Sequence, residues 1–389
     1  MTVFSPLLQA SDNRLFNWLR DVAWPFWLRR GLDRASDGRP LGFHEHLTLD
    51  EWHCTADFRR LRVVTRQIYV FSEAVIAGVA EAVEAVEAGL NYLRRFAVDP
   101  AGGYYWRFDL SGRVIDARHD LYDHAFVLLA LASAMRAIPS DDLRKEALAL
   151  DSYLRKALLH PVAGYHEGLP ISLPRRQNPH MHLFEACLAA AESFGDDPFL
   201  DRADDIARLF LDHLWQPAEG ALPEYFDEDL VPRRERTGFV VEPGHHAEWV
   251  WLLVWHTRRR ALANRPPLAG VPEAVAGLTG FIDRYGLDPA SGALVDELWS
   301  DGSLRAGGQR LWPQTERLKA EILRPDATEA KILDAYRILE SYLTPAPSGL
   351  WMERRHANGE WGDDPAPASS LYHLTAAITV ARRALAVPS

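Results

Sequence analysis

The sequence predicts an all-α fold, an (α/α)6 barrel, from two observations: about twelve helical segments and a glycine-led segment that recurs six times. The helical segments are stretches of good helix formers whose apolar residues recur with a helical period. They span residues 14–30, 58–71, 74–96, 122–138, 142–158, 182–193, 199–215, 245–263, 271–285, 314–323, 328–344 and 369–385. A long series of such helices indicates helix-on-helix packing.

The recurring segment is aromatic and acidic and lies between alternate helices. Its six copies begin at Gly42, Gly103, Gly164, Gly220, Gly292 and Gly349. Self-similarity at a nearly fixed period indicates repeated supersecondary units that stack on their neighbours. Residues alternate along each copy, and a polar turn such as Asp301-Gly302 follows, so we expect a short β-hairpin.

Each repeated unit is therefore predicted to be a helix, a short hairpin and a second helix. Elements that are consecutive in sequence usually lie next to each other in space, so six units closing on themselves give an inner and an outer ring of helices. Proline-rich stretches such as 345–348 and 364–367 have the character of loops rather than linkers. We therefore expect one domain over residues 1–389.

Composition and charge narrow the classes of partner. The formal net charge is -11, with 43 basic against 54 acidic residues, and the basic residues are scattered. This argues against a nucleic acid or an anionic membrane as partner and favours a neutral small molecule. With two cysteines, no apolar segment of membrane-spanning length and no leader-like N-terminus, we expect a cytoplasmic monomer or homodimer without disulfides.

Three histidines near predicted helix starts are the candidates for chemistry. His182 is followed by Glu185 and His245 by Glu248, each pair on one helical face, and His373 opens the last helix. They occupy comparable points of different units, so closure of the ring would bring them to the same mouth. An imidazole beside a carboxylate has a fixed tautomer and an adjusted pKa, as general acid-base catalysis requires.

Each of these residues also has a plainer interpretation. A single histidine near a helix start is usually a cap or a packing residue, and two His-x-x-Glu pairs resemble the metal sites of helix bundles. We predict no metal, because the sequence shows no third such pair. Arg66 is either a surface charge or a holder of a ligand oxygen, and Trp312 is either core or a flat surface for a ligand ring.

Several motifs, in order along the chain, are similar to those of the N-acylglucosamine 2-epimerase superfamily, which includes cellobiose 2-epimerases and D-mannose isomerases. The motifs are residues 66–69, 121–126, 178–185, 242–249, 310–316 and 368–373. The resemblance implies an (α/α)6 barrel without a metal or redox cofactor. It also implies that His245 and His373 are the acid-base residues, and that Arg66, His182 and Glu248 line a sugar pocket with Trp312.

Four further residues in or beside these motifs are predicted to bind substrate: Tyr69, Asp123, Glu185 and Glu316. The motif forms most resemble the mannose isomerase branch, so the expected activity is aldose-ketose isomerisation of D-mannose and D-fructose, extending to D-lyxose and D-xylulose. His373 would move the proton between C2 and C1 through a cis-enediolate, and His245, oriented by Glu248, would serve ring opening and the hydroxyl protons.

Three alternatives remain at this stage. A sugar 2-epimerase, acting on mannose and glucose, cellobiose or N-acylglucosamine, would share the first proton transfer. A glycoside hydrolase would need two carboxylates, for which Asp120, Asp123 and Glu248 are candidates. A sugar-binding protein without activity would use the same aromatic and histidine side chains as contacts only.

Overall fold

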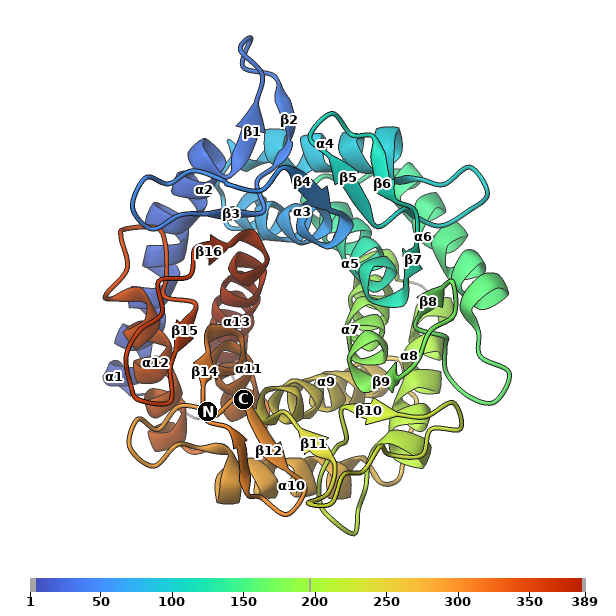
Figure 1. Cartoon of the computed structure of the whole chain (residues 1–389), viewed down its shortest axis with the longest axis vertical. Coiled ribbons are helices and arrows are strands. Elements are labelled where there is room, and N and C mark those ends of the chain that lie inside the picture. Colours follow the sequence, from blue (N-terminus) through green and yellow to red (C-terminus); the bar gives the residue numbers. More distant parts are fainter. Residues whose placement is uncertain (1–4, 196, 387–389) are drawn as a thin grey trace.

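In the computed structural model, which describes residues 5–195 and 197–386, twelve helices form two concentric rings (Figure 1). The inner helices are α3 (Leu61–Ile76), α5 (Leu121–Ala137), α7 (Gln177–Phe194), α9 (Pro243–Leu262), α11 (Leu311–Leu323) and α13 (Ala368–Ala386). The outer helices are α1 (Pro6–Trp18) continued by α2 (Trp24–Arg30), then α4 (Ala82–Tyr92), α6 (Asp141–Tyr153), α8 (Asp197–Leu209), α10 (Val271–Phe281) and α12 (Glu329–Leu343). The predicted (α/α)6 barrel is confirmed.

The inner ring is closed by packing. Each inner helix contacts the next around the circle, and α13 returns to contact α3, while α1 and α12 cover the last part of the ring. Because neighbours and the outer layer cover them on all sides, inner helices are buried almost throughout; in α5 every residue from Leu121 to Ala134 except Tyr122 is buried. Within the described residues no helix is long and apolar enough to cross a bilayer.

Short antiparallel strands join successive units at the end of the ring where the inner helices begin. The pairs between units are β4 (Phe58–Arg60) with β5 (Arg107–Asp109), β7 (His119–Asp120) with β8 (Gly168–Leu169), β9 (Arg175–Arg176) with β10 (Tyr225–Phe226), β11 (Val240–Val241) with β12 (Glu297–Trp299), β14 (Gln309–Arg310) with β15 (Arg354–Arg355), and β16 (Ala366–Pro367) with β3 (His46–Leu47). The last pair joins the final unit to the first.

The hairpins predicted within the units are formed in part. Two follow a recurring glycine as predicted, β5 with β6 (Val114–Asp116) and β12 with β13 (Leu304–Ala306), and in two more units a single bridge closes the turn, Phe226 with Pro232 and Arg355 with Trp361. A further hairpin, β1 (Leu32–Arg34) with β2 (Pro40–Phe43), ends at the first recurring glycine instead of starting there. In the described part of the other units, the strand after the recurring glycine pairs with a neighbouring unit. The strands therefore connect units more than they complete them.

The glycine that begins each recurring segment has a backbone conformation that side chains disfavour. All six have positive φ angles, from 61° at Gly220 to 151° at Gly42. At Gly164, a Cβ atom would also lie 2.8 Å from the imidazole Nε2 of His180, which is too close for a real contact. Glycine is required here both by the turn and by the inner helix that approaches it.

The first inner helix differs from the prediction. Residues 58–60 form a strand, and α3 continues to Ile76, so the predicted break near residue 72 is wrong and the turn lies around Gly78. The two residues between the predicted helices, Ser72 and Glu73, are buried inside α3. Glu73 forms ion pairs with Arg136 and Arg383 of two neighbouring helices, so its charge is a packing contact rather than a sign of a loop.

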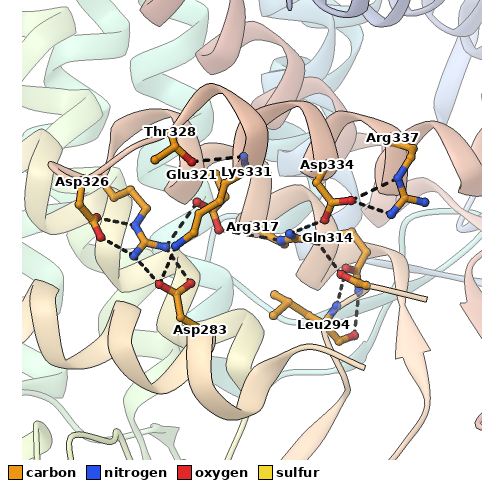
Figure 2. A network of polar contacts seen from close by, with 12 residues as sticks. Asp283, Leu294, Gln314, Arg317, Glu321, Asp326, Thr328, Lys331, Asp334 and Arg337 are labelled. Carbon is orange, nitrogen blue, oxygen red and sulfur yellow. Dashed lines mark hydrogen bonds and ion pairs between the residues drawn. The ribbon is translucent and has the colours of Figure 1, made fainter. Parts of the chain in front are cut away.

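The outer face of α11 carries charges that bind the outer ring (Figure 2). Arg317 pairs with Asp334 of α12 at 2.8 Å, and Gln314 exchanges two hydrogen bonds with the backbone of Leu294. Lys331 of α12 reaches Asp283 in η5 (Ile282–Gly286), the π-helical turn that ends the α10 helix, at 2.8 Å. The contacts of Arg317 and Gln314 connect α11 to the outer ring and to the loop of Leu294, and the Lys331 pair joins α12 to η5.

Candidate active site

The six inner helices contribute equivalent positions to the centre of the ring. The sixth residue of each inner helix points to the barrel axis. These positions are Arg66, Phe126, His182, Glu248, Glu316 and His373. Because every inner helix starts at the strand-bearing end, these six side chains lie at a similar depth, and four of them line one pocket.

The pocket has a volume of about 220 Å³. It is lined by Arg66, Tyr122, Asn178, His182, Glu242, His245, Glu248, Arg310, Trp312, Glu353, Ser369, Ser370 and His373. The structure thus brings six of the sequence-predicted residues together. Its size is below the range usual for drug-sized ligands and suits a single small, polar molecule.

His245 is held by Glu224, which belongs to the recurring segment that begins at Gly220. The imidazole Nδ1 lies 2.9 Å from Glu224 Oε2, and the same oxygen accepts a hydrogen bond from Gln177 Nε2 at 3.0 Å. The Gln177 carbonyl oxygen in turn accepts from the Trp249 indole at 2.7 Å. Burial lowers the pKa of His245, but the charges of Glu224 and Glu242 outweigh this and raise it above its usual value.

His373 is held by Glu316, with Nδ1 3.0 Å from Oε1. The other oxygen of Glu316 accepts from the Trp251 indole at 2.9 Å and lies 2.7 Å from the ammonium of Lys319. Burial opposes ionisation of Glu316, but Lys319 and His373 outweigh it and lower its pKa to about 2. Burial is the main cause that lowers the pKa of His373 to about 4, so this imidazole is neutral near pH 7.

His182 contacts two carboxyl groups, Glu248 in the pocket lining and Glu185 beneath it. Its Nδ1 lies 3.2 Å from Glu185 and 3.5 Å from Glu248. Glu185 also accepts a hydrogen bond from the Tyr372 hydroxyl at 2.5 Å. Burial lowers the pKa of His182 to about 4. A neutral His182 that donates its Nδ1 hydrogen to Glu185 presents Nε2 as a hydrogen-bond acceptor.

Glu248 differs from the buried acids that hold the histidines because its carboxyl oxygens accept no hydrogen bond from the described residues. It is 1% exposed. Burial, with the nearby charges of Glu316 and Glu185, raises its pKa well above the usual value. A neutral carboxylic acid facing the pocket can donate a hydrogen bond to a ligand oxygen.

Arg66 and Trp312 complete the walls. The Arg66 guanidinium lies 4.2 Å from the centre of the Phe126 ring and bonds the Tyr122 hydroxyl at 2.5 Å. The Trp312 ring is 4.8 Å from His245 and 6.0 Å from His373, so it lies against both imidazoles. It therefore offers a flat apolar surface between them.

Other predicted residues lie outside the pocket. Glu316 and Glu185 lie beneath it as partners of histidines, and Tyr69 packs edge-on against Tyr372, on the side of Glu185 away from the pocket. Asp123 is engaged by the Arg62 side chain at 2.6 Å and does not line the cavity.

Two further expectations are corrected. Asp120, a candidate for hydrolysis, caps α5 by accepting from the Tyr122 backbone. The expected pair of His245 with Glu248 is not formed, because Nδ1 of His245 points to Glu224.

Glu224 is the residue that the sequence interpretation missed. In three other units, the equivalent carboxylate binds the backbone and side chain of the arginine that precedes the next inner helix. These pairs are Glu45 with Arg60, Glu167 with Arg176, and Asp296 with Arg310. In the fourth unit Glu242 stands in place of the arginine, and the carboxylate of Glu224 turns to His245. An acidic residue three or four positions after the recurring glycine was the available signal.

Two groups in this region have the side chains of a metal site: His182 with Glu185 and Glu248, and Glu224 with Glu242 and His245, each within 4.8 Å. In both groups the imidazole Nδ1 is already hydrogen-bonded to a carboxylate, which is the arrangement of an acid-base pair. The prediction of a metal-free site remains to be tested with a chelator.

Comparison with known proteins identifies the group to which this geometry belongs. The N-acylglucosamine 2-epimerase family matches residues 42–377. The chain belongs to this family. It is 37% identical to a mannose-6-phosphate isomerase of Rhizobium meliloti (strain 1021) over 95% of this chain and 96% of that protein, and 24% identical to a D-mannose isomerase of Marinomonas mediterranea over 82% and 85%.

A solved structure has the same fold. The cellobiose 2-epimerase of Spirochaeta thermophila superposes with a TM-score of 0.84 at 20% identity, covering 99% of both chains. Family membership and these relatives make the protein an enzyme that isomerises or epimerises a sugar. The resemblance stated from the sequence motifs is confirmed.

Proposed function

We propose that the enzyme interconverts D-mannose and D-fructose by moving a proton between C2 and C1 through a cis-enediolate. The observation that carries this proposal is that one pocket holds two imidazoles whose pKa values are shifted in opposite directions: the pKa of His245 is raised and that of His373 is lowered. When the environments of two neighbouring groups push their pKa values apart, one is suited to be the acid and the other the base.

In this mechanism His373 is the base. Its Nδ1 hydrogen bonds to Glu316, so the neutral ring directs the Nε2 lone pair into the pocket. His373 takes the proton from C2 of the open-chain aldose and returns it to C1. His245, which retains its proton to higher pH, donates to the ring oxygen during opening and to the hydroxyl oxygens.

The negative charge that develops on the enediolate oxygens needs preformed donors. Arg66 supplies a guanidinium with an Nε hydrogen that has no partner among the described residues, and Glu248 supplies a carboxylic acid hydrogen. Such donors in a partly dry site are worth several kcal/mol of transition-state stabilisation. Neutral His182 accepts a hydrogen bond from a sugar hydroxyl through Nε2.

A second candidate is the isomerisation of D-mannose 6-phosphate, because the relative with 37% identity carries that name. The charges of the pocket favour the unphosphorylated sugar. Of the two lining arginines, Arg310 already faces the carboxylates Glu242 and Asp296, and Arg66 lies among aromatic rings. A phosphate dianion would approach the carboxylate of Glu242, and each arginine of the pocket lining is already engaged by carboxylates or aromatic rings.

The test is to incubate EDTA-treated enzyme with D-mannose, D-mannose 6-phosphate and cellobiose in deuterated water and to follow products and label by NMR. We expect D-fructose with deuterium at C1, and D-mannose 6-phosphate converted at least tenfold more slowly. Glucose labelled at C2 would replace the isomerase by an epimerase.

The other outcomes contradict the proposal in distinct ways. Preference for the phosphate ester would refute the argument from charge. Loss of activity in EDTA that returns with a divalent metal would refute metal-free proton transfer. No conversion of any of these sugars, or of D-lyxose, would remove the proposal altogether.

A further inference from the structure

We propose that Lys319 and Gln177 divide the acid and base roles between the two histidines, through the carboxylates that hold them. Lys319 neutralises Glu316 and so keeps His373 a free base, whereas the neutral amide of Gln177 leaves the full charge of Glu224 to hold a proton on His245. Both are positioning residues that do not touch the substrate. This inference rests on the proposed function.

Each histidine, its carboxylate and the partner of that carboxylate form one assembly, and the two assemblies have the same plan except for that partner. Each histidine donates Nδ1–H to a buried carboxylate, and each carboxylate is connected to an indole of α9, Trp251 directly and Trp249 through Gln177. Where Gln177 donates to Glu224 at 3.0 Å, Lys319 lies 2.7 Å from Glu316. The assemblies therefore differ by one positive charge.

Lys319 lies among the buried acids Glu316, Glu185 and Glu248 and forms its ion pair with Glu316. It is fully buried, with its ammonium over the Trp251 ring at 4.1 Å. Burying an ammonium costs several kcal/mol, and apolar residues could fill the same space more favourably. The outer face of α11 already secures the helix through Arg317 and Gln314 (Figure 2).

Other charges also act on the two histidines. Glu242 raises the pKa of His245, with Arg310 opposing it, and Arg66 of α3 lowers the pKa of His373. The buried acids Glu185 and Glu248 lie next to Glu316 and Lys319. Lys319 differs from these charges because it contacts the carboxylate that holds a histidine, and among the described residues no lysine or arginine pairs with Glu224 in the same way.

The hydrogen bonds of Gln177 have a defined direction. The Trp249 indole is only a donor, so it selects the carbonyl oxygen of the Gln177 amide and turns the NH₂ group toward Glu224. Glu224 must then accept, and its remaining capacity is directed to His245 and to the Glu242 backbone. This chain orients His245 without cancelling the charge that keeps it protonated.

The experiment exchanges the two residues one at a time. Lys319→Gln copies the neutral arrangement and keeps a hydrogen-bond donor. Without the ammonium, Glu316 and His373 together retain a proton to higher pH, and either position of that proton removes the free base. We expect the acidic limb of kcat/KM for D-mannose to move upward by about one pH unit, equivalent to about tenfold on the acidic side.

The reciprocal variant and the controls separate this effect from loss of structure. Gln177→Lys should move the alkaline limb downward, because Glu224 then holds the His245 proton less strongly. Lys319→Arg should restore the wild-type profile, and Lys331→Gln, which removes an ion pair on α12 away from the pocket, should leave it unchanged. In the Glu316→Gln background, Lys319→Gln should cause no further shift.

The outcomes distinguish the inference from the proposed function. A turnover number that falls equally at all pH values, or limbs that stay in place in both exchange variants, would overturn the inference while isomerisation stands. If Lys319→Gln fails to fold, Gln177→Lys alone decides, and an unmoved alkaline limb overturns the inference. Absence of isomerisation in the wild-type enzyme would instead remove the proposed function.

Discussion

His245 and His246 are neighbours in sequence and belong to two different layers of the molecule. His245 lines the pocket, and its environment raises its pKa. His246 is fully buried on the outer side of the same helix, where its Nε2 accepts the backbone hydrogen of Leu222 at 3.0 Å. Burial lowers the pKa of His246 to about 3, so it stays neutral and is a structural residue.

The outer layer recurs around the ring. His124 accepts from the Tyr104 backbone, His180 from that of Tyr165, and Gln314 from that of Leu294. Each of them is the fourth residue of its helix, whereas the pocket residues that lie within the inner helices are the second, third or sixth. At about 100° per residue, these offsets point in different directions. Position along the helix, not residue type, decides what a histidine does here.

The largest expected effect comes from the pocket layer. His373→Gln should lower kcat by about 10³-fold, because general acid-base catalysis is worth 10²- to 10⁴-fold. Steady-state kinetics with D-mannose measures this, with thermal denaturation as the check on folding. A loss below tenfold in a folded variant would mean that His373 is not the base.

The structural layer should respond in the opposite way. His246→Leu leaves the buried Leu222 hydrogen without an acceptor and should destabilise the fold by about 2 kcal/mol. His246→Gln should be close to wild type, since Gln314 fills the same role in another unit. Urea denaturation compares the three proteins, and equal stability of the leucine and glutamine variants would contradict the structural assignment.

A smaller effect is expected at the carboxylate behind His245. Glu224 helps to raise the pKa of His245, so Glu224→Gln should lower that pKa. If His245 acts as an acid, the activity it supports then disappears at lower pH than in the wild type. The pH profile of kcat/KM should show its alkaline limb displaced downward, with about tenfold lower activity at pH 8. An upward displacement would reverse the assigned roles.

The smallest effect tests a residue predicted from the sequence to bind substrate. Asp123→Asn removes a charge that the structure assigns to Arg62. The KM for D-mannose should stay within twofold, while stability falls by about 1 kcal/mol. A KM increase of tenfold or more would place Asp123 in contact with the sugar.

The sequence predicted what depends on local periodicity. Helical spacing and the recurring glycines predicted the ring of helices. The equivalent positions of His182, His245 and His373 near helix starts predicted that they lie together at one end of the barrel. It failed where a partner lies far away in the sequence. Glu224 reaches His245 across 21 residues of loop and strand, and Glu73 is buried against arginines of two helices that are neighbours in space but distant in sequence, which no local pattern records.

The pair of strands that closes the ring, β3 with β16, also constrains how the protein is made. His46 pairs with Pro367, so the first strand of this pair leaves the ribosome long before its partner exists. Until then the early units have an unpaired strand edge and an uncovered inner helix, α3, both prone to wrong association. Completion of the barrel is therefore a late event in synthesis, and the early units are those most in need of a chaperone.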